Sequence, residues 1–235
     1  MIRNIFRGTR GPANPKYLIV GEFFGTLEAR FNKPFIGSSG KELSKILFEA
    51  GIPENQCLFT NLINRQPVGN NMKRFFYTTK EAKAKGMFAT RGLYPKPQLE
   101  DALLDLEELI TKTKPEYIIG LGNYALWGLT ENFFSIGNSD GYKVPLGINK
   151  RRGSQIYDRV IGAKLLPTIH PAAACRQWPL RYHMKFDLQI RLNKEWTPPK
   201  NKFHVAPKFN DTLPKSTLPL WTISPFLITN SLAIF

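Results

Sequence analysis

The chain has 235 residues, of which 42% are hydrophobic and 12% aromatic, and this composition suits one sizeable globular core with at most a small appendage. Its 33 Lys and Arg residues outnumber 18 Asp and Glu residues, so the formal net charge is +15. Such an excess is unusual for an enzyme of small metabolites and favours a polyanionic partner such as DNA or RNA. The alternative is a charge that serves solubility alone.

Only two cysteines occur, Cys57 and Cys175, and they are too few to build a zinc or iron–sulfur site from cysteine alone. The N-terminus lacks the long apolar core of a signal peptide, and no apolar run is long enough to span a bilayer. We therefore expect a soluble intracellular protein, located in the cytoplasm, with no membrane contact and no metal or organic cofactor.

Residues 1–16 are basic and rich in Gly and Pro, which predicts an N-terminal arm or lead-in loop. The brief, β-branched run 17–20 predicts a buried strand that Gly21 ends, so that Glu22 stands at its carboxyl end. Ligands bind at that end of the strands in open α/β sheets. A surface carboxylate in a turn is the simpler alternative for Glu22.

Apolar residues at helical spacing predict a helix over 40–50, and the run 57–63 predicts a second strand with Asn61 near its end. The following segment, 64–96, is basic, Gly-rich and aromatic. It is either a solvated loop or a nucleic-acid contact. Its candidate DNA-binding cations are Arg65, Lys73 and Arg74.

The second half of the chain continues the alternation of strands and helices. Helices are predicted over 97–114, 123–129 and 178–192, and strands over 117–122 and 163–169. This alternation predicts an α/β fold of three layers, α/β/α, around a central four-stranded, mainly parallel sheet. The fourth strand delivers His170 at its carboxyl end, and Arg151 and Arg152 lie in a basic turn before it.

The composition changes after residue 192, where prolines punctuate a tail without a sustained period. The predicted division is therefore a basic arm (1–16), a folded domain (17–192) and a Pro-rich extension (193–235).

Three strand ends and the first loop bring four kinds of side chain toward one sheet edge: Glu22, Phe35, Asn61 and His170. An aromatic ring can stack on a planar base, an amide can read its polar edge, and an acid with an imidazole can manage water and charge. Phe35 as a core residue and His170 as a turn residue are the simpler alternatives.

The same stretches, in the same order, resemble the uracil-DNA glycosylase superfamily, and most of all its bacterial and archaeal family-four branch with related phage enzymes. No single motif is specific, but the ordered set over residues 16–192 is. The motifs are Gly21-Glu22-x-x-Gly25, Lys33-Pro34-Phe35-Ile36-Gly37-x-x-Gly40, Thr60-Asn61-Leu62-Ile63 with Pro67 and Asn70, Leu121-Gly122, and His170-Pro171-Ala172.

This resemblance implies that the chain is a monofunctional uracil-DNA glycosylase. Glu22 then orients or activates the attacking water, Phe35 stacks on flipped uracil, Asn61 reads its polar edge, and His170 stabilises the anion that develops on the base. Gly21, Phe23 and Phe24 would line the uracil site. The segment 172–176, with Arg176, would enter the duplex where the base leaves.

Three departures from the family pattern stand out. Arg65 occupies the place of one cluster-ligating cysteine and the N-terminal cysteine pair is absent, so we expect no iron–sulfur cluster. Phe23 and Phe24 replace a small residue and a proline beside the pocket, and Ala172 replaces a serine. The last two departures leave open a glycosylase-fold DNA-binding module with weak or lost catalysis, or a glycosylase for another deaminated base.

The segment 196–211 resembles the linker that joins a glycosylase-like unit to an exonuclease domain in some phage DNA polymerases. A replication polymerase is therefore a candidate partner besides single- or double-stranded DNA, and a phage-encoded chain would act in the host cytoplasm. We expect the chain to be a monomer.

Overall fold

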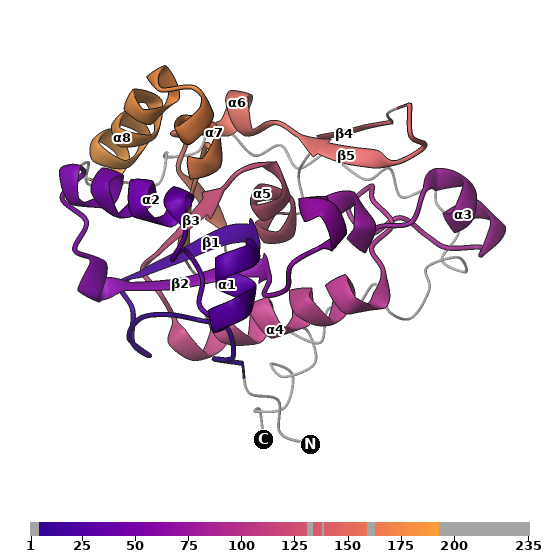
Figure 1. The fold of residues 1–235 in the computed structure, drawn as a ribbon, viewed down its shortest axis with the longest axis horizontal. Helices are drawn as coiled ribbons and strands as arrows, with labels where there is room; N and C mark the ends of the chain where they lie inside the picture. Colours follow the sequence, from indigo (N-terminus) through magenta and orange to yellow (C-terminus); the bar gives the residue numbers. More distant parts are fainter. Residues whose placement is uncertain (1–4, 131–133, 138, 159–162, 193–235) are drawn as a thin grey trace, which may run out of the picture. The chain divides into compact units, whose positions relative to one another are not determined.

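The computed structural model describes residues 5–130, 134–137, 139–158 and 163–192, and Figure 1 shows their arrangement. Its main sheet has five strands in the spatial order β2 (Cys57–Ile63), β1 (Tyr17–Phe23), β3 (Tyr117–Leu121), β7 (Ala163–Thr168) and β6 (Ile156–Asp158). The first four are parallel and are the four strands that the sequence predicts. The α/β class and mainly parallel sheet are thus confirmed.

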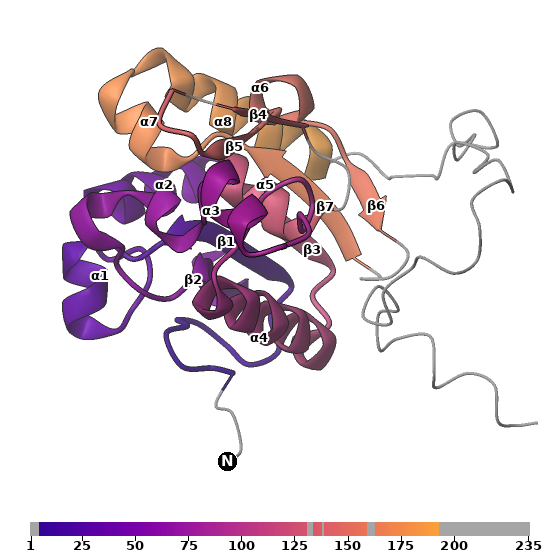
Figure 2. The same cartoon turned by 90° about the vertical axis from the view of Figure 1, so that its right-hand side faces the viewer.

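The short strand β6 is a fifth strand that the sequence did not predict. It pairs antiparallel with β7 at the edge of the sheet (Figure 2). Three residues are too few to show an alternating pattern, so only pairing with β7 identifies this strand.

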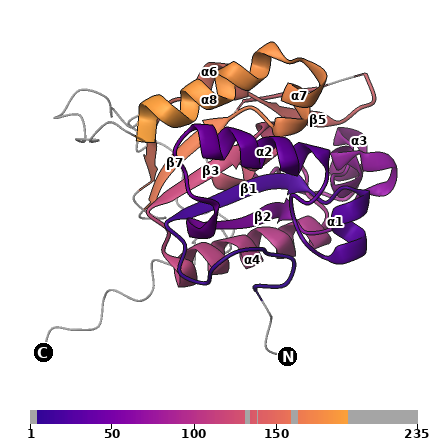
Figure 3. The same ribbon diagram turned by 60° about the vertical axis from the view of Figure 1, so that its left-hand side comes forward.

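Helices cover both faces of the sheet, which makes three layers (Figure 3). Along β1, Leu18 and Val20 pack toward α4 (Pro97–Thr113) and α5 (Asn123–Leu129). Tyr17 and Ile19 pack toward the opposite layer, which contains α2 (Ser38–Glu49) and α8 (Pro179–Leu192). Because strands covered on both faces bury every residue, these runs lack the polar alternation of a half-exposed sheet.

Helix α4 shows how local sequence sets an element. Pro97 stands in its first turn, where a missing N–H costs nothing, and Lys114 ends it in a left-handed conformation (φ 45°). Leu99, Leu103 and Leu106 are buried on one stripe, as the predicted spacing requires.

Several short elements lie between the predicted ones. They are α1 (Thr26–Phe31), α3 (Thr79–Ala84), α6 (Ile148–Arg151), α7 (Pro171–Arg176), the 3-10 turns Glu54–Gln56, Val68–Asn70 and Met72–Phe75, and the hairpin of β4 (Phe134–Gly137) and β5 (Lys143–Leu146). Helices of four to six residues show less than two turns of periodicity, which is why pattern alone misses them. α3 did carry a local signal, because Thr78 and Glu81 form a capping box.

The described part of the N-terminal arm lies against the sheet. Arg10 exchanges backbone hydrogen bonds of 3.0 and 2.8 Å with Phe59, and its guanidinium carbon stands 4.1 Å from the centre of the Phe59 ring. The same side chain pairs with Glu54 at 2.5 Å. This arm cation therefore supports β2 and is not free for DNA.

The predicted Pro-rich extension, 193–235, and the linker-like segment within it lie outside the described residues. Among the helices of the described residues, none has both the length and the apolarity needed to cross a membrane.

Candidate active site

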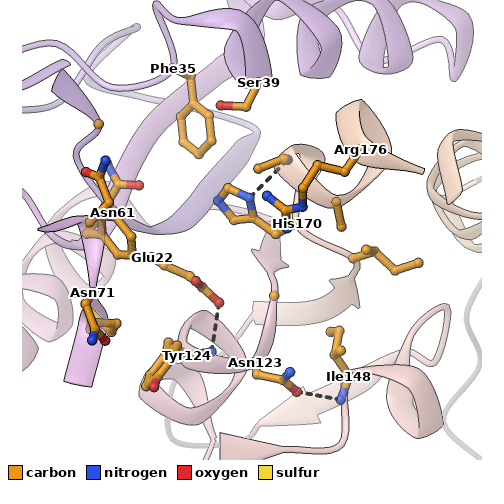
Figure 4. Close-up of a pocket in the computed structure, with 18 of the residues that line it drawn as sticks. Glu22, Phe35, Ser39, Asn61, Asn71, Asn123, Tyr124, Ile148, His170 and Arg176 are labelled. Carbon is orange, nitrogen blue, oxygen red and sulfur yellow. Dashed lines mark hydrogen bonds between the residues drawn. The ribbon is translucent and has the colours of Figure 1, made fainter. Parts of the chain in front are cut away.

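The candidate site lies at the carboxyl ends of the central strands. The chain moves from β1 to β2 on one side of β1 and then returns to β3 on the other side, so the ends of β1 and β3 flank a reversal of strand order. Such reversals leave a crevice for ligands in open α/β sheets. A cavity of about 950 Å³ opens there, at the upper end of the range typical of ligand pockets (Figure 4).

Two glycines mark where the four candidate side chains meet. A Cβ atom at Gly21 would lie 2.6 Å from Cζ of Phe35 and would also collide with Oδ1 of Asn61. A Cβ atom at Gly122 would lie 2.5 Å from Oε1 of Glu22 and 3.2 Å from Cβ of His170. The ring and the amide thus approach one glycine, and the carboxylate and the imidazole approach the other.

Glu22 is half-buried and lines the cavity, where one backbone donor holds its carboxyl group. The N–H of Tyr124, at the start of α5, donates to its Oε1 at 3.2 Å. Burial disfavours the charged form and raises the pKa of Glu22 from 4.5 to about 7, against the smaller lowering by this hydrogen bond. The carboxyl group therefore changes protonation near neutral pH, which suits a general base.

His170 stands at the N-cap of α7, directly after β7. Its Nδ1 accepts a hydrogen bond from the N–H of Ala172 at 3.2 Å, so a neutral ring carries its proton on Nε2. Burial, with a smaller contribution from the charge of Arg176, lowers its pKa from 6.5 to about 4. At neutral pH this imidazole is an uncharged hydrogen-bond donor with a fixed tautomer.

Phe35 belongs both to the core and to the cavity wall. It is 7% exposed and packs on Phe59 with ring centres 5.9 Å apart. Its backbone is left-handed (φ 55°), a conformation that bulky residues rarely adopt and that often marks functional positions. Gly40 makes this possible, since a Cβ atom there would overlap the Phe35 backbone.

Asn61 is a buried amide that faces the cavity. It is 5% exposed, and its backbone N–H donates to Oδ1 of Asn64 at 3.1 Å. Its side-chain amide has no hydrogen-bond partner among the described residues, and its atoms are accessible from the cavity that it lines. The amide is therefore open to a ligand in the cavity.

The two phenylalanines after Glu22 differ in their surroundings. Phe23 lines the cavity and is half-buried. Phe24, which the sequence assigned to the substrate pocket, is 2% exposed and does not line the cavity. Its N–H donates to the backbone oxygen of Arg65 at 3.2 Å, so the structure makes Phe24 a packing residue that joins the ends of β1 and β2.

The predicted DNA-binding cations differ in whether they line the cavity. Lys73 and Arg176 line the cavity, although Lys73 pairs with Asp140 at 2.7 Å. Arg65, Arg74 and Arg151 do not line it; the first two are exposed and the third is half-buried.

Arg152 forms an ion pair with a buried aspartate. Its Nη1 lies 2.8 Å from Oδ1 of Asp187, whose side chain is 1% exposed and also accepts from Thr168 at 2.7 Å. Leaving that carboxylate unpaired would be costly, so Arg152 is committed to the fold.

Several cavity residues were not among the sequence candidates. Tyr124 supplies the donor to Glu22, and Asn123 accepts from the N–H of Ile148 at 3.0 Å, which ties α5 to α6. Ser39 and Asn71 also line the cavity (Figure 4). The signal for Tyr124 was present, because Gly122 ends β3 at the same sheet edge and the next residues begin a helix.

An iron–sulfur cluster does not fit these residues. The thiol of Cys57 is buried, with a pKa raised by burial to about 12, whereas Cys175 is exposed on α7. The described residues contain no group of three or more His, Cys, Asp or Glu side chains that could hold a metal ion.

Comparison with known proteins identifies relatives of this chain. The family model described as the uracil DNA glycosylase superfamily matches residues 9–196. A protein of Thermotoga maritima named Type-4 uracil-DNA glycosylase is 31% identical over 166 residues, which cover 71% of this chain and 69% of that protein.

Two archaeal proteins with the same name are more distant. The one from Saccharolobus solfataricus is 26% identical over 186 residues, with 76% of this chain and 71% of that protein covered. The one from Pyrobaculum aerophilum is 25% identical over 175 residues, with 74% of each chain covered. With its sheet, its cavity and these relatives in agreement, the chain belongs to the uracil-DNA glycosylase superfamily.

Proposed function

We propose that the protein removes uracil from DNA by hydrolysing the bond between uracil N1 and the deoxyribose C1′, after the nucleotide has left the base stack. The observation that carries this proposal is the convergence of a carboxylate, a neutral imidazole, an unpaired amide and an aromatic ring on two glycines of one cavity. The Type-4 uracil-DNA glycosylase relatives support the substrate.

The charges that develop during the reaction match the groups present. As the C1′–N1 bond breaks, its electron pair moves to the uracil ring and the sugar acquires oxocarbenium character. The Nε2–H of His170 donates to the anionic base, and the ionised carboxylate of Glu22 stabilises the sugar cation. Water then bonds to C1′ and passes a proton to Glu22.

Uracil recognition rests on the opposite wall. Phe35 stacks on the base, and the Asn61 amide offers one donor and one acceptor to the alternating polar edge of uracil. Cytosine presents an amino group where uracil has a carbonyl, so it leaves one of these pairings unmade. A site built from buried hydrogen-bonding groups rejects such an analogue strongly.

DNA binding follows from the charge. The excess of cations, +15 overall, favours phosphate contacts, and Arg176 at the cavity rim is placed for one of them. These phosphate contacts offset the free-energy cost of unstacking the base, which is roughly a few kcal/mol.

The test is uracil release from a labelled oligonucleotide with a single uracil. Glu22→Gln and His170→Ala are each expected to reduce the rate by about 100-fold or more while DNA binding persists. Glu100→Gln, at an exposed glutamate of α4, is the matched control for Glu22→Gln. His183→Ala, at an exposed histidine of α8, is the matched control for His170→Ala. Full activity in both site variants would refute the assigned roles.

The same assay separates the rival functions. Binding of DNA by the unchanged protein without release of any base would favour a glycosylase-fold binding module that serves a replication polymerase. A panel of uracil, hypoxanthine and xanthine substrates tests whether Phe23, which lines the cavity, alters the base that is accepted.

A further inference from the structure

Three large aromatic side chains are exposed along one side of α8. Trp178, directly before the helix, is 58% exposed, and Tyr182 and Phe186, which follow at intervals of four residues, are each 59% exposed. That spacing places side chains on one helix face. We call these three residues the aromatic face. Large aromatic side chains are usually buried, so a contiguous exposed set marks a binding surface.

The Trp178 ring is held in place and is not simply loose on the surface. The guanidinium carbon of Arg181 lies 5.2 Å from the centre of the indole ring. Arg181 is itself fixed, because it is 8% exposed and bonds Glu42 at 2.6 Å and Glu49 at 3.0 Å. The Tyr182 ring meets the indole edge-on, with centres 6.4 Å apart. A ring that is already oriented loses little freedom when a ligand stacks on it.

Trp178, at one end of the aromatic face, stands close to the cavity rim in the chain, because Arg176 and Gln177, which line the cavity, directly precede it. Tyr182 and Phe186 follow it along α8. Helix α8 follows α7 in the chain (Figure 3), and α7 begins directly after His170. A DNA strand with its uracil in the cavity would therefore bring a neighbouring nucleotide near Trp178, the first residue of this face.

We propose that the aromatic face stacks unpaired bases that flank the extruded uracil, and that it makes single-stranded DNA the preferred substrate. The proposal deepens the proposed function and rests on it. The strongly cationic chain and the exposed Arg176, two residues before Trp178 in the chain, favour a nucleic acid over an apolar protein partner.

The preference follows from competition for stacking. In a duplex the bases next to the lesion already stack on each other and pair with the opposite strand, so they gain little from an indole. In a single strand each base that stacks on an aromatic side chain strengthens binding by a factor of about 5 to 150, with little dependence on sequence.

The test measures binding of a uracil-containing oligonucleotide, single-stranded or paired with its complement, by fluorescence anisotropy. The Glu22→Gln background of the full chain keeps the DNA intact. Trp178→Ala is expected to weaken single-strand binding about tenfold and duplex binding less than twofold. Tyr182→Ala tests the same face if the tryptophan variant folds poorly, as judged by thermal unfolding.

Matched variants isolate the stacking contribution. Trp178→Phe keeps an aromatic face and should retain most single-strand affinity, whereas Trp178→Leu keeps apolar area only and should behave as the alanine variant. Leu104→Ala, a 52% exposed position on α4, should change neither affinity. In the active background, Trp178→Ala should raise KM for the single strand and leave kcat unchanged.

Equal losses on both DNA forms, or no loss on either, would overturn the proposal. So would sedimentation that shows a dimer which Trp178→Ala dissociates, because the face would then serve a second copy of the chain. Failure of the proposed function has a different signature: no uracil release from either DNA form, whatever the ratio of affinities.

Discussion

Replacing Glu22 by Gln should make the folded protein more stable at alkaline pH, although the same change removes activity. Burial raises the pKa of this carboxyl group from 4.5 to about 7 in the folded state. The folded protein therefore binds this proton more tightly than the unfolded chain does. Stability is lost as the pH rises from the unfolded pKa through the folded one, because an ionised carboxylate must then be kept buried.

The size of the effect follows from the two pKa values. Each pKa unit corresponds to about 1.36 kcal/mol, so the displacement from 4.5 to about 7 makes ionised Glu22 unfavourable by about 3 kcal/mol at high pH. About 2.5 kcal/mol of this develops between pH 5 and pH 8. A glutamine at this position keeps an oxygen for the Tyr124 N–H and carries no charge, so its stability lacks this dependence.

The measurement is the free energy of unfolding by urea at pH 5 and pH 8 for the unchanged protein and for Glu22→Gln. The stability of the variant relative to the unchanged protein should rise by about 2.5 kcal/mol between the two pH values. Glu100→Gln, on the surface of α4, controls for the removal of a carboxylate. A difference between Glu22→Gln and the unchanged protein that is the same at both pH values would refute the reasoning.

Three further predictions concern the site and its support. Since Glu22 must be ionised to act, kcat/KM for uracil release should rise with pH through about 7 and level off above it; a flat profile from pH 5 to 9 would contradict this role. Gly122→Ala should lower kcat about 100-fold or more, because the new Cβ would lie 2.5 Å from Oε1 of Glu22 and the backbone of Gly122 has φ 93°. Gly51→Ala is the control: Gly51 has φ 75° with open space around it, so the change should cost only about 1 kcal/mol of stability and leave kcat unchanged. Arg152→Ala should lower the free energy of unfolding in urea by about 3 kcal/mol, because it leaves the buried Asp187 carboxylate without its cation. Arg176→Ala should leave stability unchanged and reduce the salt dependence of DNA binding by about one phosphate contact. The reverse pattern would contradict both assignments.

The sequence predicted the regular core well and the short elements poorly. The strand over 57–63 and the helix over 123–129 occur within the predicted bounds, because sustained apolar runs and spacing report burial directly. Residues 172–176, which the family resemblance assigned to the segment that enters the duplex, belong to the helix α7, and six residues are too few to show a helical period. The antiparallel strand β6 depends on its pairing with β7 and has no pattern of its own.

In the candidate site, too, the sequence predicted the features that depend on neighbouring residues and missed those that depend on tertiary contacts. Glu22, Asn61 and His170 line one cavity because each lies near or just beyond the carboxyl end of a parallel strand, and parallel strands end at one edge. Phe24 and Arg152 have the right chemistry for the site, yet the structure commits one to packing and the other to a buried ion pair. Residue type alone does not distinguish these roles, because burial and partners come from segments far apart in the chain.

The amino-acid sequence by itself determined the α/β class, the mainly parallel sheet and the motif set that relates this chain to its superfamily. These are carried by local periodicity and by residues close in sequence. The tertiary structure alone decided which side chains share the cavity, that burial brings the pKa of Glu22 to about 7, and that the Trp178 ring rests on a guanidinium held by two glutamates. Each of these depends on desolvation and contact between distant segments, and those quantities exist only once the chain has folded.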